Sequence, residues 1–138
     1  PQQELITMGS NYQDLRVWQQ AMALAARVYR TTDKFPKHEL YGLVSQTRRA
    51  AVSVASNIAE GKGHRSDREF LHFLYYARGS LFELETQILL SQQLQYISEA
   101  ETADVKQLIT PVAKSLTGLI NSLDQQAAAA TSLGGRRP

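Results

Sequence analysis

The sequence predicts an all-α fold, an antiparallel up-down-up-down bundle of four helices that forms oligomers. Between residues 14 and 125 proline is nearly absent, and Ala, Leu, Gln, Glu and Arg dominate, most of which favour helix. Apolar residues recur there at steps of three and four, with no competing alternation typical of strands. The connections between these periodic segments are short, which predicts that consecutive helices lie side by side in opposite directions.

Length and composition narrow the possible classes. The chain of 138 residues is 43% apolar and 20% charged, which suits one globular domain. We expect the bundle over residues 12–125, with tails at 1–11 and 126–138. The chain has no cysteine, which excludes disulfides, thiolate metal ligands and a cysteine nucleophile. Neither a membrane-spanning apolar run nor a secretory signal pattern is visible, so we expect a cytoplasmic protein without a membrane partner.

The first helix is expected over residues 14–31, with Asp14 as its N-cap or first-turn acid. It carries two adjacent apolar stripes, the first formed by Leu15, Trp18, Met22, Ala25 and Tyr29 and the second by Val17, Ala21, Leu24 and Val28. Residues 33–37 then form a loop, because Pro36 cannot continue a helix.

The second helix is expected over residues 38–60. Its apolar seam steps by four and three, through Leu40, Val44, Thr47, Ala51, Val54 and Ile58. Gly61 and Gly63 flank Lys62 directly after it, and we expect them to supply a left-handed C-cap.

Capping boxes predict the starts of the last two helices. Ser66 with Glu69 begins a helix that ends near Leu94, and Ser98 with Glu101 begins another that ends near Gln125. The seam of the third helix is Phe70, Leu74, Ala77, Leu81, Leu84 and Ile88, and that of the fourth is Val105, Leu108, Val112, Leu116, Leu119 and Leu123. Pro111 predicts either a kink or a break with Thr110 as a new cap.

More apolar residues are present than one bundle core requires. The third helix carries Leu71, Phe73, Tyr75, Tyr76, Phe82 and Leu90 beside its seam, and the first helix has its second stripe. A bundle helix needs only one buried stripe, so the surplus predicts a further packing surface and a homo-oligomer. The alternative is a monomer with a wide core and partly exposed aromatic residues.

Charge is distributed unevenly along the chain. Residues 16–78 hold eleven Lys or Arg against five Asp or Glu, and residues 79–124 hold two against six. A basic half can form a nucleic-acid-binding face. It can equally dock on the acidic half, within one subunit or between subunits.

No pattern of catalytic or metal-binding chemistry is present. The chain has neither a phosphate-binding glycine loop nor a nucleophile elbow. Glu69 and His72 form a single E-x-x-H pair, whereas a di-metal bundle needs two such pairs and further glutamates. We therefore expect no metal, no cofactor and no enzymatic activity.

Two sets of polar residues remain as candidate sites. The cations expected to contact phosphates are Arg16, Arg27, Arg48, Lys62, Arg65 and Arg68. The residues expected to hold structure or an interface together are Arg49, Ser53, Asn57, Glu60, Arg78 and Glu85. The first four of these share one face of the second helix, and the last two share one face of the third. The alternative for the second set is a solvated face.

The sequence resembles the bacterial four-helix-bundle proteins, also called 23S rRNA intervening-sequence proteins. The likeness extends over about residues 12–123 and is carried by residues 40–54 (LYGLVSQTRRAAVSV), 57–61 (NIAEG), 73–74 (FL), 77–81 (ARGSL) and 83–87 (ELETQ). Leu15, Val17, Trp18, Ala21 and Met22, and later Phe35-Pro36, match the opening of that family. Ala55-Ser56 stands where many members have Pro-Ala, which is compatible with a straighter second helix.

The resemblance implies a left-handed antiparallel bundle that assembles into a ring, a homopentamer, without known enzymatic activity. Some family members are encoded inside ribosomal RNA insertions. The chain is also similar to the accessory protein of diversity-generating retroelements, a basic pentameric barrel that works with a reverse transcriptase and nucleic acid. These likenesses imply an RNA-binding or ribonucleoprotein accessory. The alternative is an assembly scaffold whose partners are proteins.

Overall fold

The computed structural model describes residues 11–134, with side chains through residue 130. The four helices are α2 (Arg16–Thr32), α3 (Ser45–Gly63), α4 (Asp67–Gln93) and α5 (Glu99–Gly134), with short turns η1 (Tyr12–Asp14), η2 (Lys37–Glu39) and η3 (Leu40–Val44). Within the described residues there is no strand, so the all-helical prediction is confirmed. The parts of the two predicted tails at 1–10 and 135–138 lie outside the described residues.

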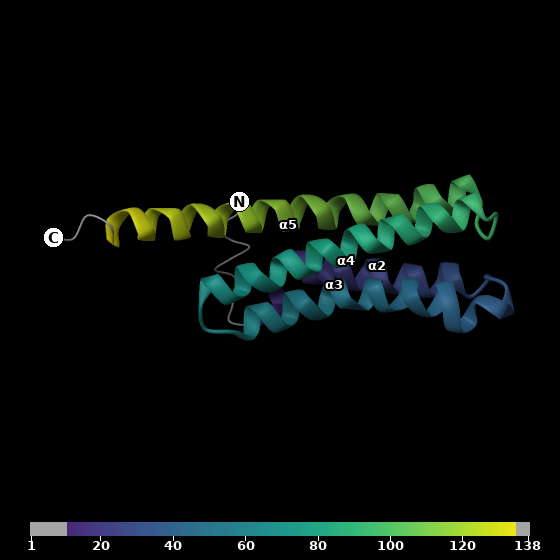
Figure 1. The fold of residues 1–138 in the computed structure, drawn as a ribbon, viewed down its shortest axis with the longest axis horizontal. Helices are drawn as coiled ribbons and strands as arrows, with labels where there is room; N and C mark the ends of the chain where they lie inside the picture. Colours follow the sequence, from purple (N-terminus) through teal and green to yellow (C-terminus); the bar gives the residue numbers. More distant parts are fainter. Residues whose placement is uncertain (1–10, 135–138) are drawn as a thin grey trace.

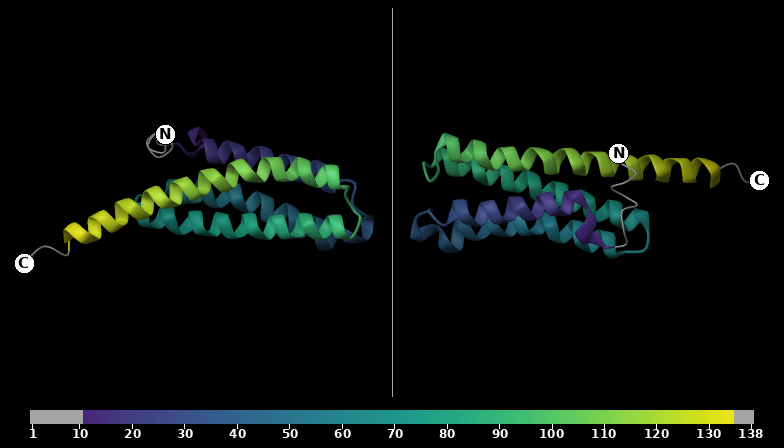
Figure 2. Two further views of the ribbon diagram at one scale, coloured as in Figure 1. Left: turned by 90° about the horizontal axis from the view of Figure 1, so that it is seen from above. Right: turned by 180° about the vertical axis from the view of Figure 1, so that it is seen from behind.

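The helices form a bundle in which each packs on the next and α5 returns to α2 (Figure 1). The connections over residues 33–44 and 94–98 lie at one end of the bundle, and the connection at 64–66 lies at the other (Figures 1 and 2). None of the described helices combines the length and apolar character needed to cross a membrane.

The predicted seams form the core. Every predicted seam residue of α4 is buried, as are Thr47, Ala51, Val54 and Ile58 of α3. On α2 the stripe from Val17 to Val28 is buried, together with Leu15 and Ala25. The other stripe members of α2 lie at the surface or only partly buried, as Trp18, Met22 and Tyr29 show. The surplus apolar residues of α2 therefore form a second surface rather than a wider core.

The α-helical part of α3 begins later than predicted. Residues 40–44 form a π-helical turn in which Gly42 leaves helical geometry, with φ −106° and ψ −109°. The Glu39 carboxylate accepts a hydrogen bond from the backbone N–H of Leu43 at 3.2 Å. It occupies the space beside Gly42, where an added Cβ would lie 2.8 Å from a Glu39 oxygen. As a result Leu40 leaves the predicted seam and is 48% exposed.

The predicted left-handed C-cap after α3 is wrong. α3 continues through Gly63, and the chain then turns out of the helix at His64, which has extended geometry with φ −78° and ψ 154°. Gly61 serves instead to bring two helices together, because a Cβ there would lie 2.6 Å from the Cβ of Phe73 on α4. The glycine is needed for close approach rather than for a turn.

The left-handed residue of the fold is at the end of α4. Gln95 has φ 64°, the one positive φ among the described non-glycine residues. The N–H of Tyr96 donates to the Ser91 carbonyl and the N–H of Gln95 to the Gln92 carbonyl, each at 2.9 Å. These two bonds form a Schellman motif, which ends the helix without a glycine.

α5 begins at the predicted capping box and continues further than predicted. The Ser98 hydroxyl accepts from the Glu101 N–H, and the Glu101 carboxylate accepts from the Ser98 N–H, both at 3.1 Å. Pro111 lies inside one continuous helix that bows gently along its length (Figure 2). Thr110 is not a new cap, because its hydroxyl donates back to the Lys106 carbonyl at 3.1 Å.

The last part of α5 projects beyond the other helices (Figure 1). The predicted end near Gln125 is too early, since the helix continues to Gly134. Residues 124–130 are all exposed. We call residues 125–134 the α5 extension.

Candidate nucleic-acid interface

Four of the predicted phosphate-binding cations gather at the end of the bundle that holds the connection between α3 and α4. We call this set, Arg16, Lys62, Arg65 and Arg68, the basic end. Arg16 opens α2, Arg65 lies in the turn at residues 64–66, and Lys62 and Arg68 lie on the helices on either side of it. Arg16, Arg65 and Arg68 are exposed, and no described carboxylate lies within ion-pairing distance of them. The Lys62 ammonium lies 5.8 Å from the centre of the Phe70 ring.

A cluster of rings adjoins the basic end, and sequence reasoning missed it. The His64 ring stacks on Phe73 with 5.0 Å between ring centres, and the His72 ring meets Tyr76 edge-on at 4.6 Å. His64 Nδ1 also lies 2.5 Å from a Glu69 carboxylate oxygen, and His72 Nε2 lies 3.1 Å from the Tyr76 hydroxyl. The available signal was the spacing of residues 72, 73 and 76 on one helix just after a histidine-bearing turn.

These rings border a hollow that we call the ring cleft. Its lining is His64, Ser66, Arg68, Glu69, His72 and Phe73. The Ser66 hydroxyl accepts from the Glu69 N–H at 3.1 Å, so the first half of the predicted capping box holds the turn in place. Arg68 therefore belongs both to the basic end and to the cleft wall.

The structure places Arg48 away from the basic end. Its guanidinium donates to the Thr32 hydroxyl at 2.9 Å, the Tyr29 carbonyl at 3.2 Å and the Asp33 carboxylate at 2.8 Å. It also lies 4.5 Å from the centre of the Tyr29 ring. Arg48 thus joins α3 to the last turn of α2. There its N–H groups bind a backbone carbonyl at the helix C-terminus, and its positive charge interacts favourably with the helix dipole.

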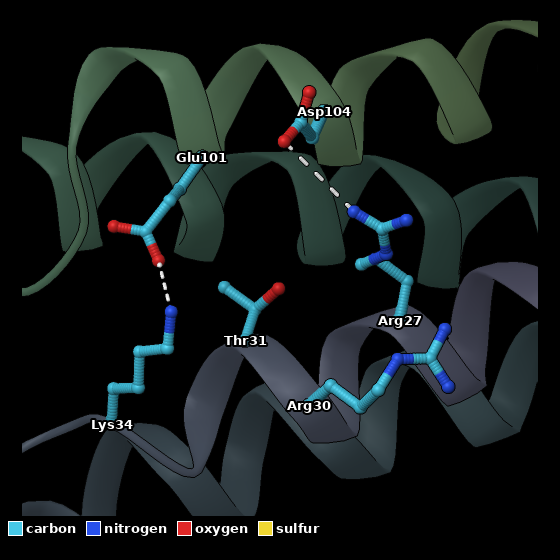
Figure 3. Close-up of a pocket in the computed structure, with 6 residues that line it drawn as sticks. All are labelled: Arg27, Arg30, Thr31, Lys34, Glu101 and Asp104. Atoms are coloured by element: carbon cyan, nitrogen blue, oxygen red, sulfur yellow. Dashed lines mark hydrogen bonds and ion pairs between the residues drawn. The ribbon is translucent and has the colours of Figure 1, made fainter.

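Arg27 lies in a charged cleft between α2 and α5 (Figure 3). The cleft is lined by Arg27, Arg30, Thr31, Lys34, Glu101 and Asp104. Arg27 pairs with Asp104 at 3.9 Å and Lys34 with Glu101 at 3.3 Å, so basic α2 meets the acidic start of α5 within one chain. The Ser98 N–H is the main cause that lowers the pKa of Glu101, and Lys34 adds to it. Because these pairs are exposed, each contributes at most about 1 kcal/mol.

Of the residues predicted to hold structure or an interface together, some form hydrogen bonds and others are exposed to solvent. Ser53 on α3 shares a hydrogen bond with Ser80 on α4 at 2.9 Å. The Asn57 amide donates to the Ser53 carbonyl at 2.8 Å and to its hydroxyl at 3.0 Å. The bond between Ser53 and Ser80 joins α3 to α4, and the Asn57 bonds lie within α3, whereas Arg49 and Glu60 are exposed.

The two predicted residues on α4 are half-buried. The Arg78 guanidinium lies 5.0 Å from the centre of the Tyr75 ring, and the Tyr75 hydroxyl donates to Asp124 on α5 at 3.0 Å. That hydrogen bond raises the pKa of Tyr75. Glu85 lies on the same helix without a hydrogen bond or ion pair to another described residue.

The surplus apolar stripe of α2 lines an apolar groove against α3. Its lining is Tyr12, Trp18, Met22, Ala25, Ala26, Tyr29, Val52, Ala55, Ser56 and Ala59. A second hollow, which includes Leu40 and Tyr41, continues the groove from Tyr29 and Val52. Tyr41 is 92% exposed. Contiguous exposed apolar surface of this kind is a candidate interaction site.

Comparisons with known proteins identify related families. The family model of the 23S rRNA-intervening sequence proteins matches residues 13–118 of this chain. A solved structure from Bacteroides thetaiotaomicron, described as a protein of unknown function from the S23 ribosomal protein family, aligns with a TM-score of 0.68. It is 21% identical, and the alignment covers 75% of this chain and 97% of that chain, a likeness that shows the fold. The comparison with curated proteins gives no match.

Proposed function

Because the chain belongs to the family of 23S rRNA-intervening sequence proteins, we propose that it is a non-enzymatic RNA-binding accessory of ribosomal RNA or of another ribonucleoprotein, working in the cytoplasm. The proposed form is a homopentamer of left-handed antiparallel bundles. The family supports the RNA partner, and the single observation that carries the proposal is the basic end.

The basic end has the properties of a phosphate-binding surface. Arg16, Arg65 and Arg68 are exposed and have no described acidic partner. Such side chains bind the backbone of RNA without reading its sequence, and binding weakens as salt competes. Arg27 and Arg48 already pair with Asp104 and Asp33, so they take a secondary part in the proposed interface.

Self-association is proposed through the apolar groove, with the α5 extension of a second copy as its occupant. Packing on a second copy would stabilise the extension further, because a short helix exposed to water is only marginally stable. Its four consecutive alanines, 127–130, offer a smooth surface, and the groove contains small residues such as Ala26, Ala55 and Ala59. Small residues on both sides allow helices to approach closely.

The test of RNA binding is fluorescence anisotropy with a labelled structured RNA, from about 50 to about 300 mM salt, where phosphate contacts weaken steeply. We expect binding with a steep negative salt slope. Replacing Lys62, Arg65 and Arg68 with alanine is expected to lower affinity and flatten the slope. The matched control replaces Arg30, Lys34 and Lys37, which removes the same charge at the opposite end of the bundle.

Two results would contradict this function. Equal loss of affinity in the triple variant and its control would show that only net charge matters. No binding by the wild-type chain at the lowest salt would remove RNA from the proposal.

A second candidate function is an assembly scaffold with protein partners and no nucleic acid. The observation in its favour is the exposed apolar groove between α2 and α3, since contiguous exposed apolar surface is a candidate protein-binding site. Sedimentation at low and high salt checks how copies associate. An oligomer held by the apolar groove persists at high salt, and one held by charge between copies dissociates.

A further inference from the structure

We propose that the ring cleft receives the base of an unpaired nucleotide, so that this protein prefers RNA loops, bulges and single-stranded ends to continuous duplex. This inference rests on the RNA binding proposed above and adds the structural class of RNA. The cleft has a cavity volume of ≈ 510 Å³, within the range of about 300–1,000 Å³ that small-molecule sites occupy.

The rings supply a stacking surface. Phe73 stands between two histidines, with His64 stacked at an interplanar angle of 18° and His72 edge-on at 83°. Tyr76 continues the cluster and is 54% exposed. Every base has a π-face, so stacking on such rings tolerates different sequences and contributes about 1–3 kcal/mol per base.

Polar groups in the cleft wall complement the rings. Arg68 can contact a phosphate or stack its guanidinium plane on a base. The Glu69 carboxylate is held by His64 at 2.5 Å and still has oxygen lone pairs that can accept an N–H of a base edge. The Ser66 hydroxyl and the His72 ring are further hydrogen-bonding groups on the same wall.

The position of the basic end beside the cleft explains why the protein would prefer unpaired RNA. Arg65 directly follows His64 in the turn and Arg68 lines the cleft, so a backbone bound by these cations would pass the mouth of the cleft. A base in a continuous duplex is stacked on both faces, and extracting it costs a few kcal/mol. A base in a loop or at an end is already free to enter.

The experiment compares two labelled RNAs of equal length, a hairpin with an unpaired loop and a blunt duplex, at one salt concentration. We expect the wild-type chain to bind the hairpin more tightly. Phe73→Leu keeps an apolar side chain beside Gly61 and removes the ring, and His72→Ala changes an exposed residue. Each is expected to weaken hairpin binding about 5- to 150-fold, since stacking contributes about 1–3 kcal/mol.

Three features separate this result from general loss of binding. Duplex affinity and the salt slope should stay unchanged in Phe73→Leu and His72→Ala, because no phosphate contact is removed. Phe82→Leu, which removes an exposed ring of α4 that does not line the cleft, should bind both RNAs as the wild-type chain does. A 2-aminopurine base in the loop should change its emission on binding to the wild-type chain and not to Phe73→Leu.

The outcomes distinguish the two proposals. Equal affinity of the wild-type chain for hairpin and duplex, with a steep salt slope, overturns the base-binding cleft and leaves RNA binding in place. The same holds if the two cleft variants bind the hairpin as tightly as the wild-type chain. Absence of binding to either RNA overturns both proposals together.

Discussion

At the scale of single residues, Gly61 determines how closely α3 and α4 approach. A Cβ at this position would lie 2.6 Å from the Phe73 Cβ and 3.0 Å from Cδ1 of Phe70. Neither is the flexible end of a long side chain, so the added methyl group would push the helices apart. The same contact supports Phe73 in the ring cleft, which connects packing in the core to the proposed site.

We therefore predict that Gly61→Ala destabilises the fold by about 1–3 kcal/mol, the usual cost of overpacking. The matched control is Gly79→Ala, because a Cβ at Gly79 meets nothing within 4 Å. That control should gain about 0.5–1 kcal/mol from the better helix propensity of alanine. Urea unfolding followed by circular dichroism measures both. Equal effects of the two substitutions would contradict the close-contact explanation.

Arg48 shows why single residues were harder to predict than the helices. An arginine in a basic segment of the sequence is indistinguishable from a phosphate ligand until its neighbours in space are known. Its partners Thr32 and Asp33 lie 16 and 15 residues earlier in the sequence, on the other side of a loop. Only the return of α3 alongside α2 brings these groups together.

At the scale of elements, the sequence predicted the helices better than their ends. The burial of seam residues follows from the periodicity of apolar residues, which is local information. The capping box at Ser98 and Glu101 was also predictable, since both bonds lie within one turn. The π-helical turn at Leu40–Val44 was not, because it depends on where the Glu39 carboxylate is held.

Glu39 connects two elements at the end of the bundle that contains the longer connections. Its carboxylate accepts from the Tyr96 hydroxyl at 2.8 Å and from the Leu43 N–H at 3.2 Å. These hydrogen bonds, that of Tyr96 first, lower the pKa of Glu39 below its ordinary value of 4.5. A lowered folded pKa means that the ionised form stabilises the fold above that value, and that the stabilisation is lost as acid protonates the carboxylate.

The unfolding midpoint in urea should accordingly fall as the pH drops from about 6 to about 3. Glu39→Gln should be less stable than the wild-type chain near neutral pH and should show a weaker fall in acid. Glu60→Gln is the control, because Glu60 is exposed and forms no hydrogen bond with another described residue. A pH dependence of Glu39→Gln equal to that of the wild-type chain would contradict the role of this carboxylate.

At the scale of the whole molecule, ion pairs within one chain account for part of the uneven distribution of charge along the sequence. The acidic start of α5 lies against basic α2 in the charged cleft, as the alternative of docked halves predicted. Arg16, Arg65 and Arg68 of the basic end are exposed and form no ion pair with a described carboxylate. The sequence could place both charge sets along the chain, but the division between paired and exposed cations depends on which helices become neighbours.

The α5 extension provides a test of the proposed assembly. A chain that ends after Asp124 should unfold at nearly the same urea concentration, since residues 124–130 are exposed and outside the core. It should associate more weakly in sedimentation velocity, because the occupant of the apolar groove is removed. Met22→Glu, which places a charge in the groove, should weaken association in the same way. Unchanged association in both variants would assign the contact between copies to another surface.

The α5 extension and the basic end project from the same end of the bundle, while two connections close the other end (Figure 1). A ring with cyclic symmetry turns every copy the same way up. In the proposed ring, with the helices along its symmetry axis, one rim would carry the cations and the ring clefts, and the other rim would carry the connections at 33–44 and 94–98. Nucleic acid would then bind to one face of the assembly only. Several equivalent sites on that face would bind one strand together.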